Sequence, residues 1–254
     1  MLITPSSGTF PRPSAMVVWG AGDASSAHRH HSVQLILALA GNLRIRGGEG
    51  EPWHCCDGAL VRADALHEVD ARGATVLIGF IEPESRLGAA LAERIAADIT
   101  HLPADEAARW RSTIFAAGSP PGDEKIKRWL EADLLDGRPQ PTLHPGVSRV
   151  LRHVRHHLQE PDALSLSALA VVAGLSPSRL MHAFTASMGI ALRPYLLWSR
   201  LQLACGELMR GASTTEAALQ AGFADAAHLS RTCRRMLGTT PTAIAASKAR
   251  SNID

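Results

Sequence analysis

Four polar residues early in the chain have the types and spacing of a ligand site. His28 and His30 are separated by one residue, Gln34 follows four positions later, and His67 lies beyond a turn. Alternate residues of a strand point to the same face, so these side chains would converge. Imidazoles bind zinc, nickel, copper or iron, and neutral imidazoles also hydrogen-bond organic molecules. Three interpretations stay open: a divalent transition metal held by the three histidines, an organic effector, or a purely structural cluster.

Two tryptophans lie in the same part of the chain as these histidines. Trp19 and Trp53 are large apolar side chains with one polar atom each, and such residues either line an effector pocket or fill a core. The sequence therefore predicts an effector pocket formed by Trp19, His28, His30, Gln34, Trp53 and His67.

A second kind of chemistry is suggested by the distribution of charge. The net charge is +2, but residues 1–145 contain 14 Lys and Arg against 18 Asp and Glu, whereas residues 146–254 contain 12 against 6. Lys248 is the only lysine of the second part, so its positive charge is nearly all arginine. A basic domain joined to an acidic one favours a polyanionic partner for the basic half, and double-stranded DNA is such a partner.

Residues 166–184 have the pattern of a helix-turn-helix unit, which could present such arginines to DNA. Ala170 is small where a second helix would cross the first, and Gly174 tolerates the positive φ of the turn. Ser176 can cap the second helix, and Pro177 suits its first position. Apolar residues then follow one helical turn apart, as a core-facing helix requires.

The same pattern returns in residues 215–237. Ala218 is the small residue, Gly222 the turn glycine, Asp225 the capping residue and Leu229 the first core residue of the second helix. The turn is one residue longer than in the first unit. A pattern that occurs twice is much less easily produced by an ordinary helical hairpin than a single occurrence.

A long helical stretch, residues 193–209, separates the two units and measures roughly 26 Å. Recognition helices about 34 Å apart would enter successive major grooves on one face of B-DNA. Upstream of the first unit a further amphipathic helix is predicted, because apolar residues recur at helical spacing at Val147, Val150, Leu151, Val154 and Leu158.

The elements before this helical part are of two kinds. Apolar or alternating runs at 33–39, 43–46, 59–61 and 75–81 are separated by turn residues, which predicts a small sandwich or barrel. From Glu84 onward the spacing becomes helical, at Leu87, Leu91 and Ile95 and again at Ile126, Leu130 and Leu134. These helices would pack on the barrel or on a second copy of the chain, so a homodimer is one expected assembly.

The proline-rich segment 138–146 is the best domain boundary in the sequence. The expected fold class is a multidomain α+β protein. It would have a sensor barrel at 1–82, a helical linker or dimerisation region at 83–137, and an all-α domain with two helix-turn-helix units at 146–254.

Residues 147–246 resemble the AraC/XylS family of transcription regulators. The resemblance rests on Ala218-Leu-Gln-Ala-Gly-Phe223, Asp225, Leu229-Ser-Arg231 and Gly238-Thr-Thr-Pro241, and on Ser176-Pro-Ser-x-Leu180-x-x-x-Phe184 with Gly189 and Tyr195. One departure is Cys233, which stands where the family usually has phenylalanine and predicts lighter packing there.

The resemblance implies which residues contact DNA. Base-facing positions would be Ser178, Arg179, Met181 and His182 in the first unit and Ala226, Ala227, His228 and Arg231 in the second. Arg179 and Arg231 would make bidentate guanine contacts, whereas Arg200, Arg234 and Arg235 would contact phosphates and position the protein. Ala226 and Ala227 offer only methyl groups.

Residues 27–67 resemble a cupin barrel, the sensor of one branch of this family. The metal-binding cupin pattern has histidines at the places of His28, His30 and His67, a glycine at that of Gly41, and a glutamate where this chain has Gln34. Glutamine is a poor metal ligand, and Arg62-Ala-Asp64 replaces the usual proline-glycine turn. No cofactor is therefore assigned beyond the divalent metal left open above.

These observations predict an effector-responsive, sequence-specific transcription regulator that is not an enzyme. The expected partners are promoter or operator DNA, a small-molecule effector and RNA polymerase. No association with a membrane is expected. Two alternatives are a metal-dependent cupin enzyme with a helical appendage, against which the lost glutamate argues, and an architectural DNA-binding protein without a sensor. The chain has no apolar stretch of about 20 residues, no signal-peptide pattern and four cysteines without a disulfide framework, so the expected location is the cytoplasm.

Overall fold

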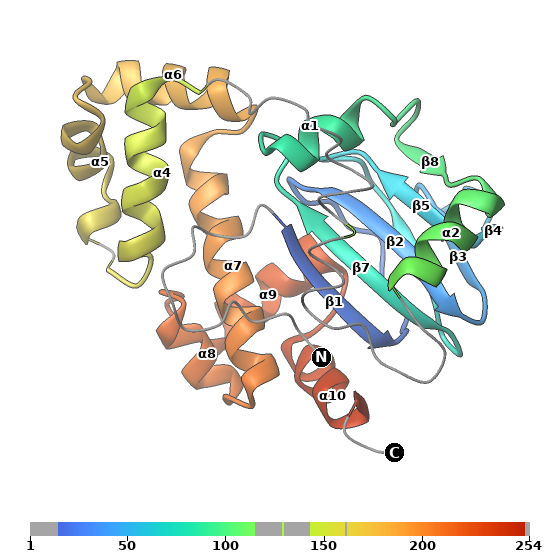
Figure 1. Ribbon diagram of the computed structural model, residues 1–254. Helices are drawn as coiled ribbons and strands as arrows, with labels where there is room; N and C mark the ends of the chain where they lie inside the picture. Colours follow the sequence, from blue (N-terminus) through green and yellow to red (C-terminus); the bar gives the residue numbers. More distant parts are fainter. Residues whose placement is uncertain (1–14, 115–128, 130–142, 161, 252–254) are drawn as a thin grey trace.

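The structure is a computed structural model that describes residues 15–114, 129, 143–160 and 162–251. A β-rich N-terminal domain packs beside a helical C-terminal domain, and the long helix α7 lies between them in the view of Figure 1. Within the described residues no helix is long and apolar enough to cross a membrane.

The N-terminal domain contains two antiparallel sheets. One has five strands in the order β1-β7-β2-β5-β8, and the other has three in the order β4-β3-β6. The strands are Ala15–Ala21 (β1), Val33–Ala40 (β2), Leu43–Arg46 (β3), His54–Cys56 (β4), Gly58–Val61 (β5), Glu68–Asp70 (β6), Thr75–Ile81 (β7) and Ile99–His101 (β8). The predicted β structure is confirmed, and its strands are antiparallel, whereas closure of the sheets into a barrel is not shown.

Strand β2 is buried on both faces, which explains its uninterrupted apolar sequence. Leu35 and Leu37 belong to an apolar cluster that also contains Trp110. Ile36 and Ala38 belong to a second cluster, which includes residues of the three-stranded sheet. Because successive side chains of a strand alternate between faces, both sets must be apolar to cover the two layers.

Two helices cover the outer face of the five-stranded sheet, α1 (Arg86–Ala92) and α2 (Ala104–Ile114). Leu87 and Leu91 are buried in the sheet-facing cluster, so this predicted apolar face is occupied by the chain's own sheet and not by a second copy. The prediction of helix through Ile95 is wrong, because α1 ends at Ala92 and β8 follows. β8 pairs with β5 and covers what would otherwise be an open sheet edge. Ile126, Leu130 and Leu134 lie outside the described residues.

The C-terminal domain is helical. Its helices are α4 (Pro145–His157), α5 (Leu166–Ala173), α6 (Pro177–Met188), α7 (Leu192–Arg210), α8 (Thr214–Gln220), α9 (Ala226–Leu237) and α10 (Pro241–Ser251), with a short 3-10 helix at Asp162–Leu164. Most of the predicted boundary segment 138–146 lies outside the described residues, and α4 begins at Pro145 with His144 as its cap.

Helix α7 joins two apolar cores. Leu192 and Tyr195, near its start, are buried with α4, α5 and α6, whereas Leu201 and Leu208, near its end, are buried with α8 and α9. Its 19 residues span about 28 Å. The sequence-based length of roughly 26 Å is therefore close to the observed helix, and each helix-turn-helix unit has its own core.

Candidate DNA interface and effector cavity

The first helix-turn-helix unit consists of α5 and α6. Gly174 ends α5 in the left-handed conformation at φ 63°, and Ser176 Oγ accepts a hydrogen bond from the Arg179 N–H at 3.4 Å at the start of α6. Leu180 and Phe184 are fully buried beneath α6. The predicted turn, cap and core residues of this unit are confirmed.

The second unit consists of α8 and α9 and is built in the same way. Gly222 adopts φ 74° in the turn, and Asp225 Oδ1 accepts a hydrogen bond from the His228 N–H at 2.6 Å. Ala218 and Leu229 are buried as predicted. Cys233 is also fully buried, and its thiol contacts that of Cys205 on α7.

Most of the predicted DNA contacts lie on the open faces of the second helices. The exposed members are Ser178, Arg179, Met181 and His182 on α6 and Ala227, Arg231, Arg234 and Arg235 on α9, whereas Ala226, His228 and Arg200 are half-buried. The His228 ring packs edge-on against Phe223 at 5.1 Å between centroids. That contact restricts the directions in which this imidazole can reach.

Arg200 occupies a different environment from the other predicted contacts. It lies on α7, beneath the turn of the second unit, so that a Cβ on Gly222 would be 3.2 Å from Arg200 Nε. Burial lowers the pKa of Arg200, and its Nε is buried with no hydrogen-bond partner in the described part of the chain. This site differs from the solvated surface expected for a phosphate contact.

The arginines of the two domains differ in their partners. Arginines of the N-terminal domain form ion pairs with carboxylates, among them Arg44, Arg46, Arg62, Arg72, Arg94, Arg109 and Arg111. For Arg179, Arg231, Arg234 and Arg235 no carboxylate of the described residues lies within ion-pair distance. Unneutralised guanidinium groups on an open helix face can bind phosphates and guanine edges.

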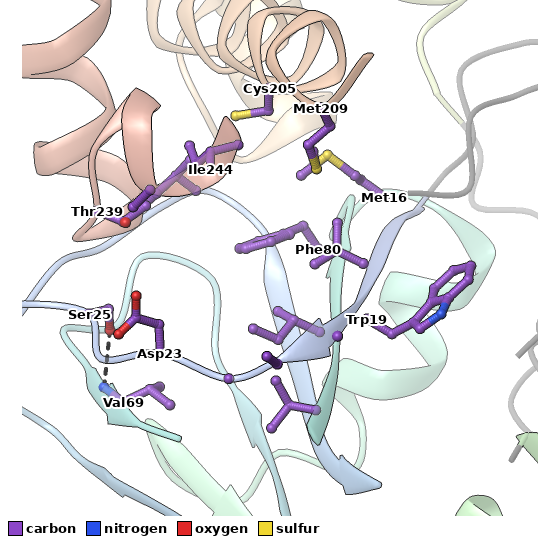
Figure 2. Close-up of a pocket in the computed structure, with 18 of the residues that line it drawn as sticks. Met16, Trp19, Asp23, Ser25, Val69, Phe80, Cys205, Met209, Thr239 and Ile244 are labelled. Atoms are coloured by element: carbon purple, nitrogen blue, oxygen red, sulfur yellow. Dashed lines mark hydrogen bonds between the residues drawn. The ribbon is translucent and has the colours of Figure 1, made fainter. Parts of the chain in front are cut away.

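A cavity of about 590 Å³ lies between the two domains. Its lower wall in Figure 2 includes Phe80 of the five-stranded sheet, and its upper wall includes Cys205, Met209 and Ile244 of the C-terminal helices. Trp19 also belongs to the lining, but its ring points away from the upper wall and is buried with Leu37 on the other face of the sheet. Most of the lining is apolar. Its size lies within the range of roughly 300–1,000 Å³ that small-molecule sites occupy.

The predicted effector residues fall into three groups. Trp19, His28 and Gln34 line the interdomain cavity. His30 and His67 contact Gln34 but are not among the cavity-lining residues. Trp53 lies elsewhere, with the guanidinium groups of Arg44 and Arg46 at 5.1 and 4.5 Å from its ring centroid. Trp53 therefore stacks on arginines of the three-stranded sheet and does not line this cavity.

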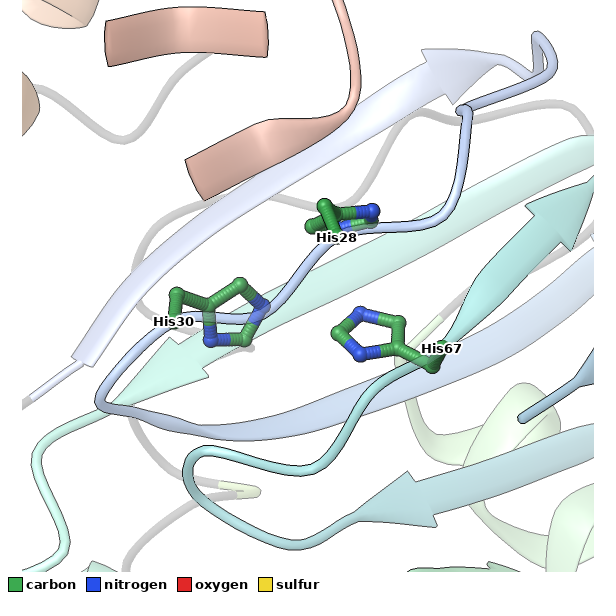
Figure 3. Close-up of side chains that lie close together, drawn as sticks. All are labelled: His28, His30 and His67. Atoms are coloured by element: carbon green, nitrogen blue, oxygen red, sulfur yellow. The ribbon is translucent and has the colours of Figure 1, made fainter. Parts of the chain in front are cut away.

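The three histidines form a compact buried cluster (Figure 3). The sequence placed His28 and His30 on one strand, which is wrong: both precede β2, and His28 makes an isolated bridge with His67. Burial and then the neighbouring His30 lower the pKa of His28 to about 4. Burial and then a neighbouring imidazole lower the pKa of His30 and of His67 to about 3. All three imidazoles are therefore neutral near pH 7.

Backbone carbonyls fix the ring protons of two of these histidines. His28 Nδ1 lies 2.8 Å from Ser26 O, and His67 Nδ1 lies 3.0 Å from Ala65 O. Because a carbonyl oxygen only accepts, both Nδ1 atoms must donate. In a neutral ring the Nε2 atom then carries a lone pair, so His28 Nε2 and His67 Nε2 are acceptors.

This assignment also orients the side-chain amide of Gln34. The amide atom 2.8 Å from His67 Nε2 and 2.9 Å from His30 Nε2 occupies the Oε1 position. With an oxygen there, His67 would need a second ring proton and a positive charge, which its burial opposes. Amide oxygen and nitrogen exchange places by a half-turn of the amide group. The nitrogen therefore belongs at this position, where it donates to both imidazoles.

The loop of residues 25–31, which we call the interdomain loop, contacts the C-terminal ends of α6 and α9, the second helices of the two helix-turn-helix units. The Ser26 N–H and Oγ donate to Gly238 O at 2.9 and 3.2 Å, and Gly238 is the C-cap of α9. His31 Nε2 lies 3.1 Å from Met188 O, the last residue of α6. One short loop of the N-terminal domain thus holds the C-terminal ends of α6 and α9.

His31 is charged in this position. Its Nδ1 donates to Asp64 Oδ2 at 2.7 Å and its Nε2 to Glu84 Oε1 at 2.9 Å. Burial alone would lower the pKa of His31, but the hydrogen bonds and charges of Glu84 and Asp64 outweigh burial and raise this pKa to about 9. The sequence analysis did not select Ser26 or His31, because the contacts that identify them lie in the other domain.

Raising the pH should weaken the contact between His31 and α6. Because the folded pKa is raised above 6.5, the stability from this charge is fully present below pH 6.5 and is lost as the pH rises through about 9. Hydrogen exchange of the amides at 186–190 should therefore accelerate between pH 8 and pH 10 beyond the intrinsic rate. His31→Gln should lack this additional acceleration, and equal behaviour of the two proteins would contradict the assignment.

Comparison with known proteins finds one matching domain family and several relatives that match part of the chain. A family of helix-turn-helix domains matches residues 169–247. The uncharacterized HTH-type transcriptional regulators SAS0078 and SA0097 of Staphylococcus aureus are each 35% identical over 96 residues, which is 37% of this chain. The chain spans only 13% of the length of these relatives.

Solved structures resemble nearly the whole chain at low sequence identity. A structure of ToxT from Vibrio cholerae has a TM-score of 0.57 at 10% identity, with 92% of this chain and 98% of that chain covered. ToxT bound to (E)-4-(8-methylnaphthalen-1-yl)but-3-enoic acid has a TM-score of 0.56 at 10% identity, covering 92% and 99%. ToxT bound to an unsaturated fatty acid has a TM-score of 0.52 at 9% identity, covering 94% and 97%. The two-domain fold is therefore shared.

Proposed function

We propose that this chain, whose C-terminal region is an AraC-type helix-turn-helix domain, is a sequence-specific transcription regulator controlled by a small molecule bound between its two domains. The observation that carries the proposal is the set of exposed arginines on α6 and α9, Arg179, Arg231, Arg234 and Arg235, which have no carboxylate partner among the described residues. The relatives named above are transcription regulators, so the alternative of a metal-dependent enzyme has no support from them. The partners would be operator DNA, the effector and RNA polymerase.

Arg179 and Arg231 are the proposed base-reading residues. Each is exposed on the second helix of its unit, and a guanidinium group can donate two hydrogen bonds to a guanine edge. Arg234 and Arg235 follow one turn later on α9 and would contact phosphates. Because Arg200 is half-buried and lacks a free approach at Nε, we give it the smaller part in DNA binding.

Selection of genomic DNA fragments tests this function. Purified protein is mixed with a fragment library, non-specific competitor and moderate salt, and the retained fragments are sequenced. A discrete shared site is the expected result. Diffuse binding that salt abolishes uniformly would instead indicate an architectural DNA-binding protein, because phosphate contacts alone carry no sequence preference.

Arg231→Ala should weaken binding to that site by about 5- to 150-fold, which corresponds to the roughly 1–3 kcal/mol of a bidentate base contact. Arg62→Ala is the matched control, because it removes the same charge from an ion pair with Asp98 in the other domain. Titration of labelled site DNA at fixed salt measures both. Equal losses of DNA affinity in the two variants, or an unchanged base preference in Arg231→Ala, would show that Arg231 does not contact bases.

The effector would act through the interdomain loop. The cavity is lined by Ser25 and His28 of that loop and by Leu237 and Thr239, which flank the C-cap of α9. Residues of α1 and α2 do not belong to this lining, so the packing of the 84–137 helices, our sequence-based hypothesis, is a less direct route. A ligand that fits the cavity differently in two loop positions would shift the equilibrium between them.

A divalent transition metal is the second candidate occupant. Ligand atoms of His28, His30 and His67 all lie within 4.8 Å of one another, and carbonyl contacts at Nδ1 orient imidazoles as they do in metal sites. The Gln34 amide already contacts two of the three rings, so a metal would have to displace it. Elemental analysis of purified protein decides this point: less than about one metal per ten chains would eliminate a resident ion.

A further inference from the structure

We propose that the interdomain cavity selects an apolar molecule whose polar end donates hydrogen bonds, an alcohol or an amine, and discriminates against carboxylates. This proposal rests on the effector site proposed above and names its ligand class. It follows from the two polar groups that the histidine cluster presents to the cavity, from the charged residues at its edge and from the apolar character of its other walls.

The first polar group is His28 Nε2. Its ring proton is on Nδ1, held by Ser26 O at 2.8 Å. No hydrogen bond to Nε2 is found among the described residues, yet this atom is not one of the sealed, unpartnered polar atoms. Since His28 lines the cavity, we assign this Nε2 as a lone-pair acceptor for a ligand.

The second polar group is the remaining amide atom of Gln34. One end of this amide contacts His30 Nε2 and His67 Nε2. The ring proton of His67 is held at Nδ1 by Ala65 O, so its Nε2 accepts and requires the amide nitrogen at that end. The other end is then the oxygen. It has no hydrogen bond within the described residues, it is not sealed, and Gln34 lines the cavity. The polar part of the cavity therefore presents a second acceptor.

The charged residues at the cavity edge also disfavour a ligand with a carboxylate. Asp23 lines the cavity with an exposed carboxylate, near Ser25 in Figure 2. The basic residue of the lining is Arg210, and its guanidinium is already paired with the Glu207 carboxylate. A ligand carboxylate placed at His28 and Gln34 would face two acceptors and no donor from either side chain; the hydroxyl donors of the lining belong to Ser25 and Thr239. Burying a carboxylate against two acceptors is strongly unfavourable, whereas a hydroxyl or amine at the same place satisfies them.

The remaining walls favour a flexible or aromatic apolar body. Met16, Met209 and Cys205 contribute polarisable sulfur atoms, and Phe80 contributes a ring face. Methionine side chains adapt to differently shaped apolar ligands. These walls supply affinity for the apolar part, while His28 and Gln34 decide which polar group is accepted.

Three probes of equal chain length test the proposal: 1-octanol, octylamine and octanoate, titrated into the full-length protein at pH 7.5 by isothermal calorimetry. We expect octanol and octylamine to bind with a Kd at least tenfold lower than that of octanoate. Ile244→Trp, which fills the cavity from α10, should abolish binding of all three. Equal affinity, a preference for octanoate, absence of binding by all three probes, or binding that Ile244→Trp does not affect would each overturn the proposal.

Two variants identify the groups responsible. Gln34→Leu removes one acceptor and should reduce the preference for octanol over octanoate by several-fold while octanoate binding stays unchanged. Asp23→Asn, at an exposed position, should weaken octylamine binding, strengthen octanoate binding and leave octanol binding unchanged. Unchanged preferences in both variants would contradict the assigned acceptors. Selection of DNA fragments is measured separately, so a discrete DNA site together with failed probe binding would reject the ligand class and leave the regulator function standing.

Discussion

Acidification from pH 6 to pH 5 is expected to reduce the free energy of unfolding of the N-terminal domain by up to about 4 kcal/mol. His28, His30 and His67 have pKa values lowered to about 4, 3 and 3 in the folded protein. The unfolded chain binds protons at these histidines near pH 6.5, and the folded chain does not. Stability is therefore fully present above pH 6.5 and is lost as the pH falls towards the folded values.

The slope of stability against pH measures this effect. Nearly three protons are taken up on unfolding in this window, and each contributes about 1.4 kcal/mol per pH unit. His31 contributes little there, because its raised pKa leaves it protonated in the folded chain and the unfolded histidine is also largely protonated. Urea unfolding at several pH values gives the slope. In His28→Gln the slope should correspond to about one proton fewer taken up on unfolding. A wild-type slope that corresponds to one proton or less would contradict the assignment of three neutral histidines in the folded protein.

Gly238→Ala is expected to separate the interdomain loop from α9. Gly238 has φ 63°, where a Cβ costs roughly 1–2 kcal/mol, and that Cβ would collide with the Ser26 carbonyl oxygen and lie 2.7 Å from His28 Nδ1. Relief requires movement of the loop, which breaks the two hydrogen bonds from Ser26 to Gly238 O. At about 0.5–1.5 kcal/mol for each bond, a further loss of roughly 1–3 kcal/mol follows.

Gly189→Ala is the matched control for this variant. Gly189 also has φ 63° and caps α6, but a Cβ there would meet Glu84 Oε1 at 3.7 Å and His31 Cε1 at 3.8 Å, ordinary contact distances. Gly189→Ala should therefore lose only the stability that a Cβ at positive φ costs, roughly 1–2 kcal/mol. Urea unfolding compares the stabilities, and hydrogen exchange at residues 25–31 reports the loop. Equal destabilisation by both variants, with unchanged exchange in the loop, would show that the Ser26 contact does not restrain α9.

The sequence predicted the helix-turn-helix units in detail because their signals are local. Gly174 and Ser176 lie within one turn of each other, and their roles follow from backbone conformation and capping alone. The apolar run at 33–39 also predicted a strand, which is β2. Strand β8 was missed, because three residues carry no periodicity and their pairing with β5 depends on residues about 40 positions earlier.

The candidate site could be predicted only in part for the same reason. His28 and Gln34 were identified from the spacing of polar residues, but the opposite wall of the cavity comes from α7 and α10. The contact of Ser26 with Gly238 joins residues 212 positions apart, and that of His31 with Met188 joins residues 157 apart. Trp53 was assigned to the pocket from its residue type, whereas its neighbours Arg44 and Arg46 determine where the ring lies.

The attachment of α6 and α9 to one short loop has a consequence for the architecture of the operator. Each base pair inserted between two half-sites moves them about 3.4 Å apart and rotates one about the DNA axis by roughly 35°. Helix α7 alone could bend or twist to follow such a change, but a second connection through the β domain resists it. Tolerance of altered half-site spacing and helical phase would then depend on the N-terminal domain as well as on α7. An effector that frees the loop would broaden the set of promoters the protein can occupy.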